Sequence, residues 1–155
     1  MSRMKTAPLC AAMALYIALG MVLGIAWAAA QELTPEGVWL HSSRDVQVEI
    51  APCGDRLCGR VVWLEDPEDK AGEPLRDPEN PDRTQRRRLV MGMMVIRGLV
   101  RSGPRLWTNG TIYNPKDGNT YRVRVTMEDP DTLHVRAFVL LPLFGETEVW
   151  TRVPG

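Results

Sequence analysis

The side chains of this 155-residue chain that could do chemistry are few and dispersed, and the only histidines are His41 and His134. Ser42 and Ser43 follow His41, but neighbouring residues of an extended strand point to opposite faces, so this spacing predicts no nucleophile–base pair. His134 alternates with apolar residues beside Arg136 and is expected to face solvent. Because no nucleophile, base and orienting group can be placed together, the sequence predicts no catalytic residue and no enzymatic activity.

The densest group of metal-ligating side chains is the acidic stretch EDPED at residues 65–69. Its spacing does not match the oxygen ligands of an EF-hand calcium loop. A run of this kind is expected to form a solvated acidic loop. The sequence therefore predicts neither a metal site nor a cofactor.

Two cysteines, Cys53 and Cys58, lie in the segment APCGDRLCG. In an oxidising compartment this pair is expected to form a disulfide across the Gly-Asp turn. A redox site is the alternative, but the CxxxxC spacing differs from CxxC and no histidine or lysine lies beside either thiol. A metal site would need more ligands than two thiolates.

The N-terminus indicates the compartment. Arg3 and Lys5 precede an apolar run over residues 7–30 that ends in three alanines. This order is typical of a secretory signal peptide, so residues 1–30 are predicted to be removed after Ala30, leaving a periplasmic or secreted protein. The alternative is an uncleaved anchor, because the run is long enough to span a bilayer.

The mature chain is then residues 31–155, a length expected for a single domain. Without Arg3 and Lys5 it carries 17 basic and 19 acidic side chains. A net charge near −2 gives no general reason to expect nucleic acid or an anionic membrane as a partner. No integral membrane span is predicted in this part of the chain.

Residues 107–125 are the clearest structural signal and predict a β-hairpin. Thr111 and Tyr113 suit a strand, residues 114–118 (NPKDG) suit a turn, and the apolar side chains after Tyr121 alternate with arginines. Further strands are predicted at residues 37–40, 46–50, 57–64, 93–100, 105–107, 133–137 and 147–152. Short strands at this spacing predict an all-β fold, and successive hairpins favour a single antiparallel up-and-down β-barrel of about eight strands.

The first and last strands carry a recognisable pair. Gly37-x-Trp39, together with Arg152, resembles the lipocalin (calycin) signature, which implies that the guanidinium stacks on the indole and closes one end of a barrel. The wider pattern of CGDRLCGRVVWL, DPENPDRTQRRRLVMGMMVIRGL, IYNPKDGNTY and VWTR resembles DUF2147, a family of small exported bacterial proteins, over residues 37–152. The resemblance implies a lipocalin-like barrel and no particular functional residue.

The aromatic side chains are the candidate walls of a pocket: Trp63, Trp107, Tyr113 and Tyr121. Trp63 shares a strand face with Val61, and Tyr121 shares one with Val123, so both are expected to point inward. Methionines at positions 91, 93 and 94 add adaptable apolar surface. The alternative is a packed core, because a barrel of this size encloses either packed side chains or one small ligand.

A long polar break between the expected strands, residues 65–88, is predicted to be a functional or mobile loop. Within it, residues 77–88 are the predicted lid. Asp77, Asn80 and Asp82 are expected to form Asx turns and to pair with neighbouring arginines such as Arg87 and Arg88, holding the lid across the barrel mouth. The alternative is that these arginines contact an anion or a lipid headgroup directly.

These patterns predict a non-enzymatic binding module for a small apolar or amphipathic envelope molecule, held inside the barrel or at its mouth. The alternative is a structural or protein-interaction factor of the cell envelope with a packed core and an envelope protein as partner. A contiguous exposed apolar patch, such as one at residues 140–144 (LLPLF), would favour the alternative.

Overall fold

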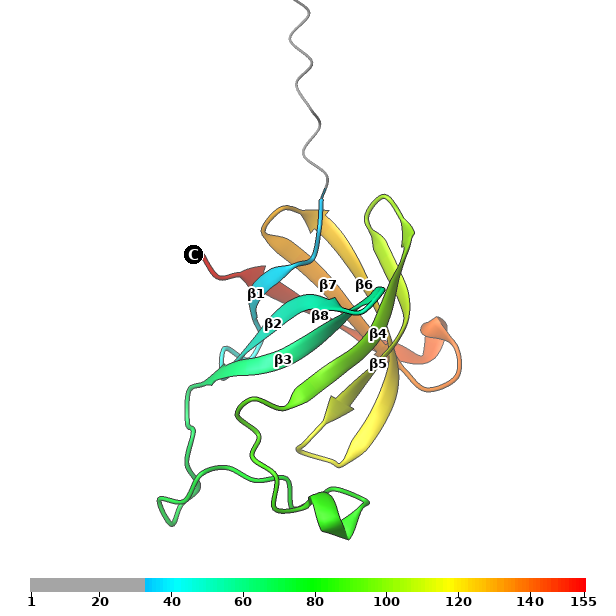
Figure 1. Ribbon diagram of the computed structural model, residues 1–155. Helices are drawn as coiled ribbons and strands as arrows, with labels where there is room; N and C mark the ends of the chain where they lie inside the picture. The colour runs from blue at the N-terminus through cyan, green and yellow to red at the C-terminus, as the bar shows by residue number, and fades with distance from the viewer. Residues whose placement is uncertain (1–32) are drawn as a thin grey trace, which may run out of the picture. The chain divides into compact units, whose positions relative to one another are not determined.

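The computed structural model describes residues 33–155, so the predicted signal peptide lies outside the described residues. Eight antiparallel strands form a closed barrel in sequence order, which confirms the predicted fold (Figure 1). The strands are β1 (Gly37–Leu40), β2 (Val46–Cys53), β3 (Arg56–Leu64), β4 (Met94–Gly103), β5 (Leu106–Asn114), β6 (Asn119–Asp129), β7 (Thr132–Phe138) and β8 (Gly145–Arg152).

In the part of the chain that the structure describes, helical structure is limited to two single 3-10 turns, Arg83–Gln85 between β3 and β4 and Pro142–Phe144 between β7 and β8. Within residues 33–155 no helix is long and apolar enough to cross a bilayer. The barrel closes where β8 pairs with β1, with Trp39 opposite Arg152. Closure leaves no sheet edge unpaired, which removes the usual site of edge-to-edge aggregation.

The predicted hairpin of β5 and β6 is present. The carbonyl of Asn114 accepts a hydrogen bond from the N–H of Gly118 at 2.9 Å, and Gly118 has a φ of +71°. A glycine at this position avoids the steric penalty that a side chain would bring to the left-handed region. The turn therefore spans residues 114–118, as the sequence predicted.

The core is continuous and aromatic. Trp39, Trp107 and Trp150 are buried in it, from β1, β5 and β8. Most of the other core residues are the inward-facing members of alternating strands, as period-two patterning requires: Val48, Ile50, Val61, Met93, Val95, Ile96, Leu99, Val123, Val125, Met127, Leu133 and Val135.

One end of the barrel, called here the closed end, is sealed by Arg152. Its guanidinium carbon lies 4.2 Å from the centroid of the Trp39 ring, and its nitrogens donate to three carbonyls, of Thr34, Glu36 and Pro130. The indole N–H of Trp39 donates to the Pro35 carbonyl at 2.7 Å. The turn between β2 and β3 lies at the same end, and there Cys53 and Cys58 form the predicted disulfide.

The expected inward orientation of Trp63 is wrong. Val61 pairs with Val48, but Trp63 pairs with Gln47, so Val62 is an extra residue in β3. A bulge of one residue reverses the face on which the following side chains lie. Trp63 is consequently 39% exposed on the outer wall, whereas Val61 is buried in the core.

Candidate ligand-binding cleft

Residues 77–88, the predicted lid and called the lid below, belong to the longest connection in the barrel, residues 65–93 between β3 and β4. Arg76 and Leu89 form an antiparallel bridge, and the N–H of Val90 donates to the Leu75 carbonyl at 2.9 Å, so the two ends of the lid are held together. Asp82 caps the 3-10 turn by accepting from the Thr84 hydroxyl and from the Thr84 N–H, and these two hydrogen bonds lower the pKa of the carboxyl. The lid is therefore locally ordered by its own turns.

A buried carboxylate attaches the lid to the barrel wall. Asp77 is fully buried, and its two oxygens accept hydrogen bonds from the Tyr113 hydroxyl at 2.7 Å, from Arg88 Nε at 2.8 Å and from Asn80 Nδ2 at 2.7 Å. Tyr113 belongs to β5, so these bonds join the lid to the sheet. Because both carboxylate oxygens are occupied, the charge is buried with the partners that such burial requires.

Tyr113 is the partner on the sheet. The guanidinium carbon of Arg88 lies 4.8 Å from its ring centroid, and Asn80 Nδ2 donates to its hydroxyl at 3.2 Å. Burial and the hydrogen bond to the Asp77 carboxylate raise the pKa of Tyr113. The phenol therefore stays protonated at neutral pH and remains a donor to Asp77.

The lid also rests on the β5–β6 turn. A Cβ added at Gly118 would lie 2.0 Å from the carbonyl oxygen of Glu79, so only glycine permits this approach of the two backbones. Glycine is thus needed at position 118 for two reasons, the positive φ of the turn and the close contact with the lid.

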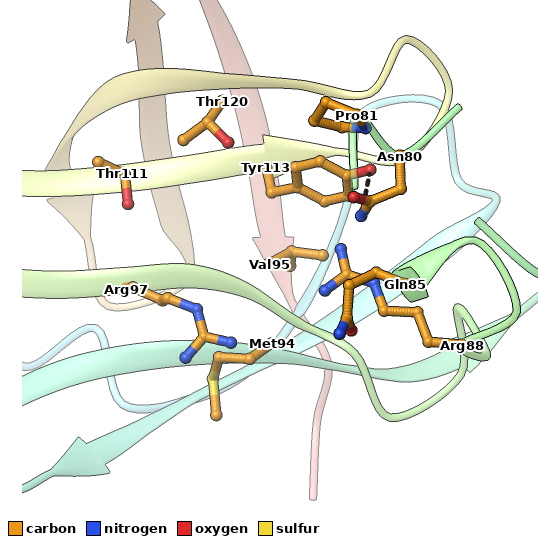
Figure 2. A pocket seen from close by; sticks show the side chains of 10 residues that line it. All are labelled: Asn80, Pro81, Gln85, Arg88, Met94, Val95, Arg97, Thr111, Tyr113 and Thr120. Atoms are coloured by element: carbon orange, nitrogen blue, oxygen red, sulfur yellow. Dashed lines mark hydrogen bonds between the residues drawn. The ribbon is translucent and has the colours of Figure 1, made fainter. Parts of the chain in front are cut away.

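Between the lid and the barrel wall lies a cleft of about 250 Å³ (Figure 2). On β5, Thr111 pairs with Arg97 and Tyr113 pairs with Thr120, and these residues alternate with the core-facing Ile112. The cleft therefore lies on the outer face of the wall, beside the barrel mouth and under the lid. Its lining residues are Asn80, Pro81, Gln85, Arg88, Met94, Val95, Arg97, Thr111, Tyr113 and Thr120.

The lining combines an apolar wall with a cation. Pro81, Met94 and Val95 supply the apolar atoms, while Gln85 and the two threonines supply hydrogen-bonding groups. Arg97 is exposed and makes no ion pair within residues 33–155, whereas Arg88 is already held by Asp77. An arrangement of this kind suits an amphipathic molecule with an acidic group. No group of metal-ligating side chains occurs in the same part of the chain.

The aromatic residues expected to line one pocket lie in different parts of the structure. Tyr113 lines the cleft, together with Asn80 and Arg88 from the lid. Trp107 is buried in the core instead, and the hydroxyl of the half-buried Tyr121 donates to Asp117 at 2.8 Å.

Other lid residues lie outside the cleft. Arg87 is exposed, and its backbone carbonyl accepts from Arg76 at 2.6 Å. Sequence reasoning missed Gln85, Arg97, Thr111 and Thr120, because strand alternation places the last three on a solvent face and does not indicate that the lid overhangs it.

A second polar cluster lies at the barrel mouth, and it corrects the expectation for His41. Its Nδ1 lies 2.6 Å from Ser43 Oγ, and its Nε2 contacts the Glu148 carboxylate on β8. The turn between β1 and β2 curls back, so two residues treated as members of an extended strand meet. Ser43 and His41 are thus brought together with an acid, which the spacing alone did not predict.

This cluster forms a clamp across the mouth. The Ser43 hydroxyl donates to Asp45, so its proton is directed away from His41, and Asp45 in turn pairs with Lys116 at 2.9 Å. The hydrogen bond from His41 lowers the pKa of Glu148. Burial raises the pKa of Asp45, but the hydrogen bonds from Ser43 and Lys116 outweigh it and leave that pKa below its ordinary value. The network links the β1–β2 turn, the β5–β6 turn and strand β8 across the mouth.

Comparison with known proteins gives the family and the fold. A search of curated proteins found no significant match. Among solved structures, protein HP1028 from the human pathogen Helicobacter pylori, described as belonging to the lipocalin family, is similar with a TM-score of 0.71 and 22% identity, covering 79% of this chain and 84% of that chain. The profile of a family described as "Uncharacterized protein conserved in bacteria (DUF2147)" matches residues 37–152. Since this match spans the whole barrel, from the start of β1 to the end of β8, the chain belongs to the DUF2147 family.

Proposed function

We propose that this protein is a non-enzymatic binding module that holds a small amphipathic molecule of the cell envelope at the mouth of the barrel. The observation that carries the proposal is the cleft under the lid, where Arg97 lies beside the apolar side chains of Met94 and Val95. An acidic headgroup would pair with the guanidinium, and a short apolar part would pack on the methionine.

The size of the cleft limits the ligand. Its volume of about 250 Å³ lies just below the range of roughly 300–1,000 Å³ that is usual for small-molecule pockets. A complete two-chain lipid would not fit within it. The ligand is therefore a small acid, or one end of a longer molecule that extends past the lid.

Two observations support an envelope location. The Cys53–Cys58 disulfide is of the kind that persists in oxidising compartments. Residues 1–30 have the composition of a cleaved export signal. Together they favour the periplasm or the exterior as the place where a ligand is met.

The test is native mass spectrometry of the mature protein, purified from the periplasm without detergent and compared with the denatured chain. We expect an extra mass in the native spectrum that disappears on denaturation. Arg97→Gln should lose it while keeping the far-UV circular dichroism of the barrel. Arg87→Gln removes an exposed lid arginine outside the cleft and is the matched control. A bare native protein, or equal loss in both variants, would contradict the proposal.

A second candidate function, an interaction module of the envelope, is favoured by one separate observation. The segment between β7 and β8 presents its apolar side chains to solvent. Exposed apolar patches of this kind mark sites of association. This function would not require an occupied cleft.

A further inference from the structure

The apolar loop, residues 139–144, is the largest concentration of exposed apolar side chains in the described part of the chain. Its side chains are between 58% and 79% exposed: Val139, Leu140, Leu141, Leu143 and Phe144. They follow β7 directly, and the loop ends immediately before β8. Scattered single apolar residues are normal on a protein surface, but five within six positions are not.

The loop is held in place by an arginine beneath it. Arg136 of β7 donates from Nε to the Pro142 carbonyl at 2.6 Å and from Nη2 to the Leu143 carbonyl at 3.3 Å. Its Nη1 donates to Thr147 Oγ1 at 2.7 Å on β8. The apolar side chains are thus presented by an ordered backbone, so that binding would cost little further ordering.

A group of arginines lies beside the loop on the outer wall. Arg122 pairs with Phe138, which immediately precedes the loop, and Arg124 pairs with Arg136. Like charges directly opposite each other destabilise a sheet, so the pairing of Arg124 with Arg136 lowers the stability of the barrel. In residues 33–155 none of these guanidinium groups makes an ion pair.

The carboxylates of β8 lie on the other side of the sheet. Glu146 and Glu148 pair with Ala137 and Val135, and the latter is a core residue, so both acids are directed to the barrel mouth. Glu148 accordingly contacts His41 and not the arginines. The outer wall next to the apolar loop is therefore locally basic, although the mature chain is slightly acidic.

We propose that the apolar loop and the adjoining arginines dock the protein on the surface of an anionic lipid bilayer. Leucine and phenylalanine side chains would enter the boundary between headgroups and acyl chains, while Arg122 and Arg124 would lie at the level of the lipid phosphates. Apolar side chains flanked by unpaired cations are the pattern that interfacial membrane binding requires.

A second copy of the chain fits this surface poorly. In a two-fold contact the same patch meets itself, and arginines would face arginines. An anionic bilayer supplies the charge that the surface lacks. The contact would also put the cleft near the lipid, since Arg97, Thr111 and Arg122 form one cross-strand row that leads to Phe138. The docking nonetheless stands or fails independently of whether the cleft holds a ligand.

The experiment is vesicle flotation of residues 31–155. The unit from residue 33 onward forms a complete barrel with its own core, and the apolar run at residues 7–30 would bind vesicles by itself. Vesicles contain either phosphatidylcholine alone or equal parts of phosphatidylcholine and phosphatidylglycerol. We expect flotation with the anionic vesicles, weakening with added salt, and little with phosphatidylcholine alone.

Three variants identify the surface. Leu143→Ser with Phe144→Ser should lower binding by about tenfold or more, from the lost apolar burial. Arg122→Gln with Arg124→Gln should lower binding to anionic vesicles by about fivefold for each charge removed. Trp63→Ser removes an exposed aromatic side chain from β3, which is at least three strands away around the barrel, and should change nothing.

Three outcomes would overturn the proposal, with circular dichroism verifying that each variant is folded. One is the absence of flotation with anionic vesicles at low salt. Another is equal flotation of the loop variant and the parent. The third is a dimer, or a complex with a co-purifying protein, that the loop substitutions dissociate while flotation is unaffected.

Discussion

The two ends of the barrel are built from different interactions. At the closed end a buried indole, a stacked guanidinium and three backbone carbonyls meet, and the disulfide lies on a neighbouring turn. At the mouth, charged side chains hold the lid, two turns and strand β8, and among these side chains only Asp77 is fully buried. Burial and packing contribute stability that depends little on pH, whereas partly exposed charge pairs contribute little and respond to pH and salt. The mouth is therefore the end that can open at low cost.

The largest expected effect lies at the closed end. Trp39→Ala should lower the free energy of unfolding by about 3–5 kcal/mol, because it removes a fully buried indole and leaves Arg152 without its stacking partner. Trp63→Ala is the matched control and should cost about 0.5 kcal/mol or less, since that side chain lies on the outer wall. Urea denaturation of both variants gives the comparison. Equal costs would contradict the assignment of Trp39 to the core.

The second effect is local and lies at the mouth. Asp77→Ala leaves the Tyr113 hydroxyl and Arg88 Nε without their acceptor and should lower the free energy of lid opening by about 1–3 kcal/mol. Amide hydrogen exchange should quicken across residues 77–90, and the amides of β6 and β7 should be unchanged. Asp82→Ala, an exposed cap within the same lid, should have a smaller effect. Uniform acceleration throughout the barrel would show that the lid and barrel unfold together.

The third effect concerns the disulfide. Replacing Cys53 and Cys58 together by serine should lower the free energy of unfolding by about 2 kcal/mol, because the bridge closes only a short loop. The lid should exchange hydrogen at the same rate as in the parent, since the bridge lies at the closed end. Thermal unfolding in the presence and absence of a reductant measures the stability, and faster lid exchange would show that the two ends are coupled.

The smallest effect is the pH dependence of the mouth clamp. Glu148 and Asp45 both have pKa values below their ordinary values of 4.5 and 3.8. Lowered pKa values stabilise the fold above the ordinary values, and this contribution is lost as pH falls through the folded values. Each group should contribute less than about 1 kcal/mol, because each is about a third or more exposed. The thermal midpoint of Glu148→Gln should therefore fall less steeply on acidification than that of the parent. Parallel curves would rule out the clamp.

The fold could be read from the sequence because its signals are local. Alternation of apolar and polar residues, together with turn residues such as Pro115 and Gly118, sets strand boundaries with few competing interpretations. Successive hairpins then leave closure as the way to satisfy both edge strands. The pairing of Asp77 with an arginine of the same loop follows from their nearness in the sequence, whereas the bond from Asp77 to Tyr113 does not.

The site could not be read in the same way. Its position depends on bulges and on a loop crossing the outer wall, and neither follows from alternation. The extra residue Val62 turned Trp63 outward, and the curled turn after β1 brought His41 against Ser43. Arg97 reads as an ordinary solvent-facing strand residue. It becomes a site residue because the lid, anchored through Tyr113, overhangs it.

The measurement that tests the central claim most directly is a crystal structure of residues 31–155, purified without detergent so that any bound molecule is retained. We expect electron density for a small molecule in the cleft, with an acidic group at Arg97 and apolar atoms against Met94. Density inside the barrel among Trp39, Trp107 and Trp150, or an empty cleft in a protein that still carries its extra mass, would contradict it.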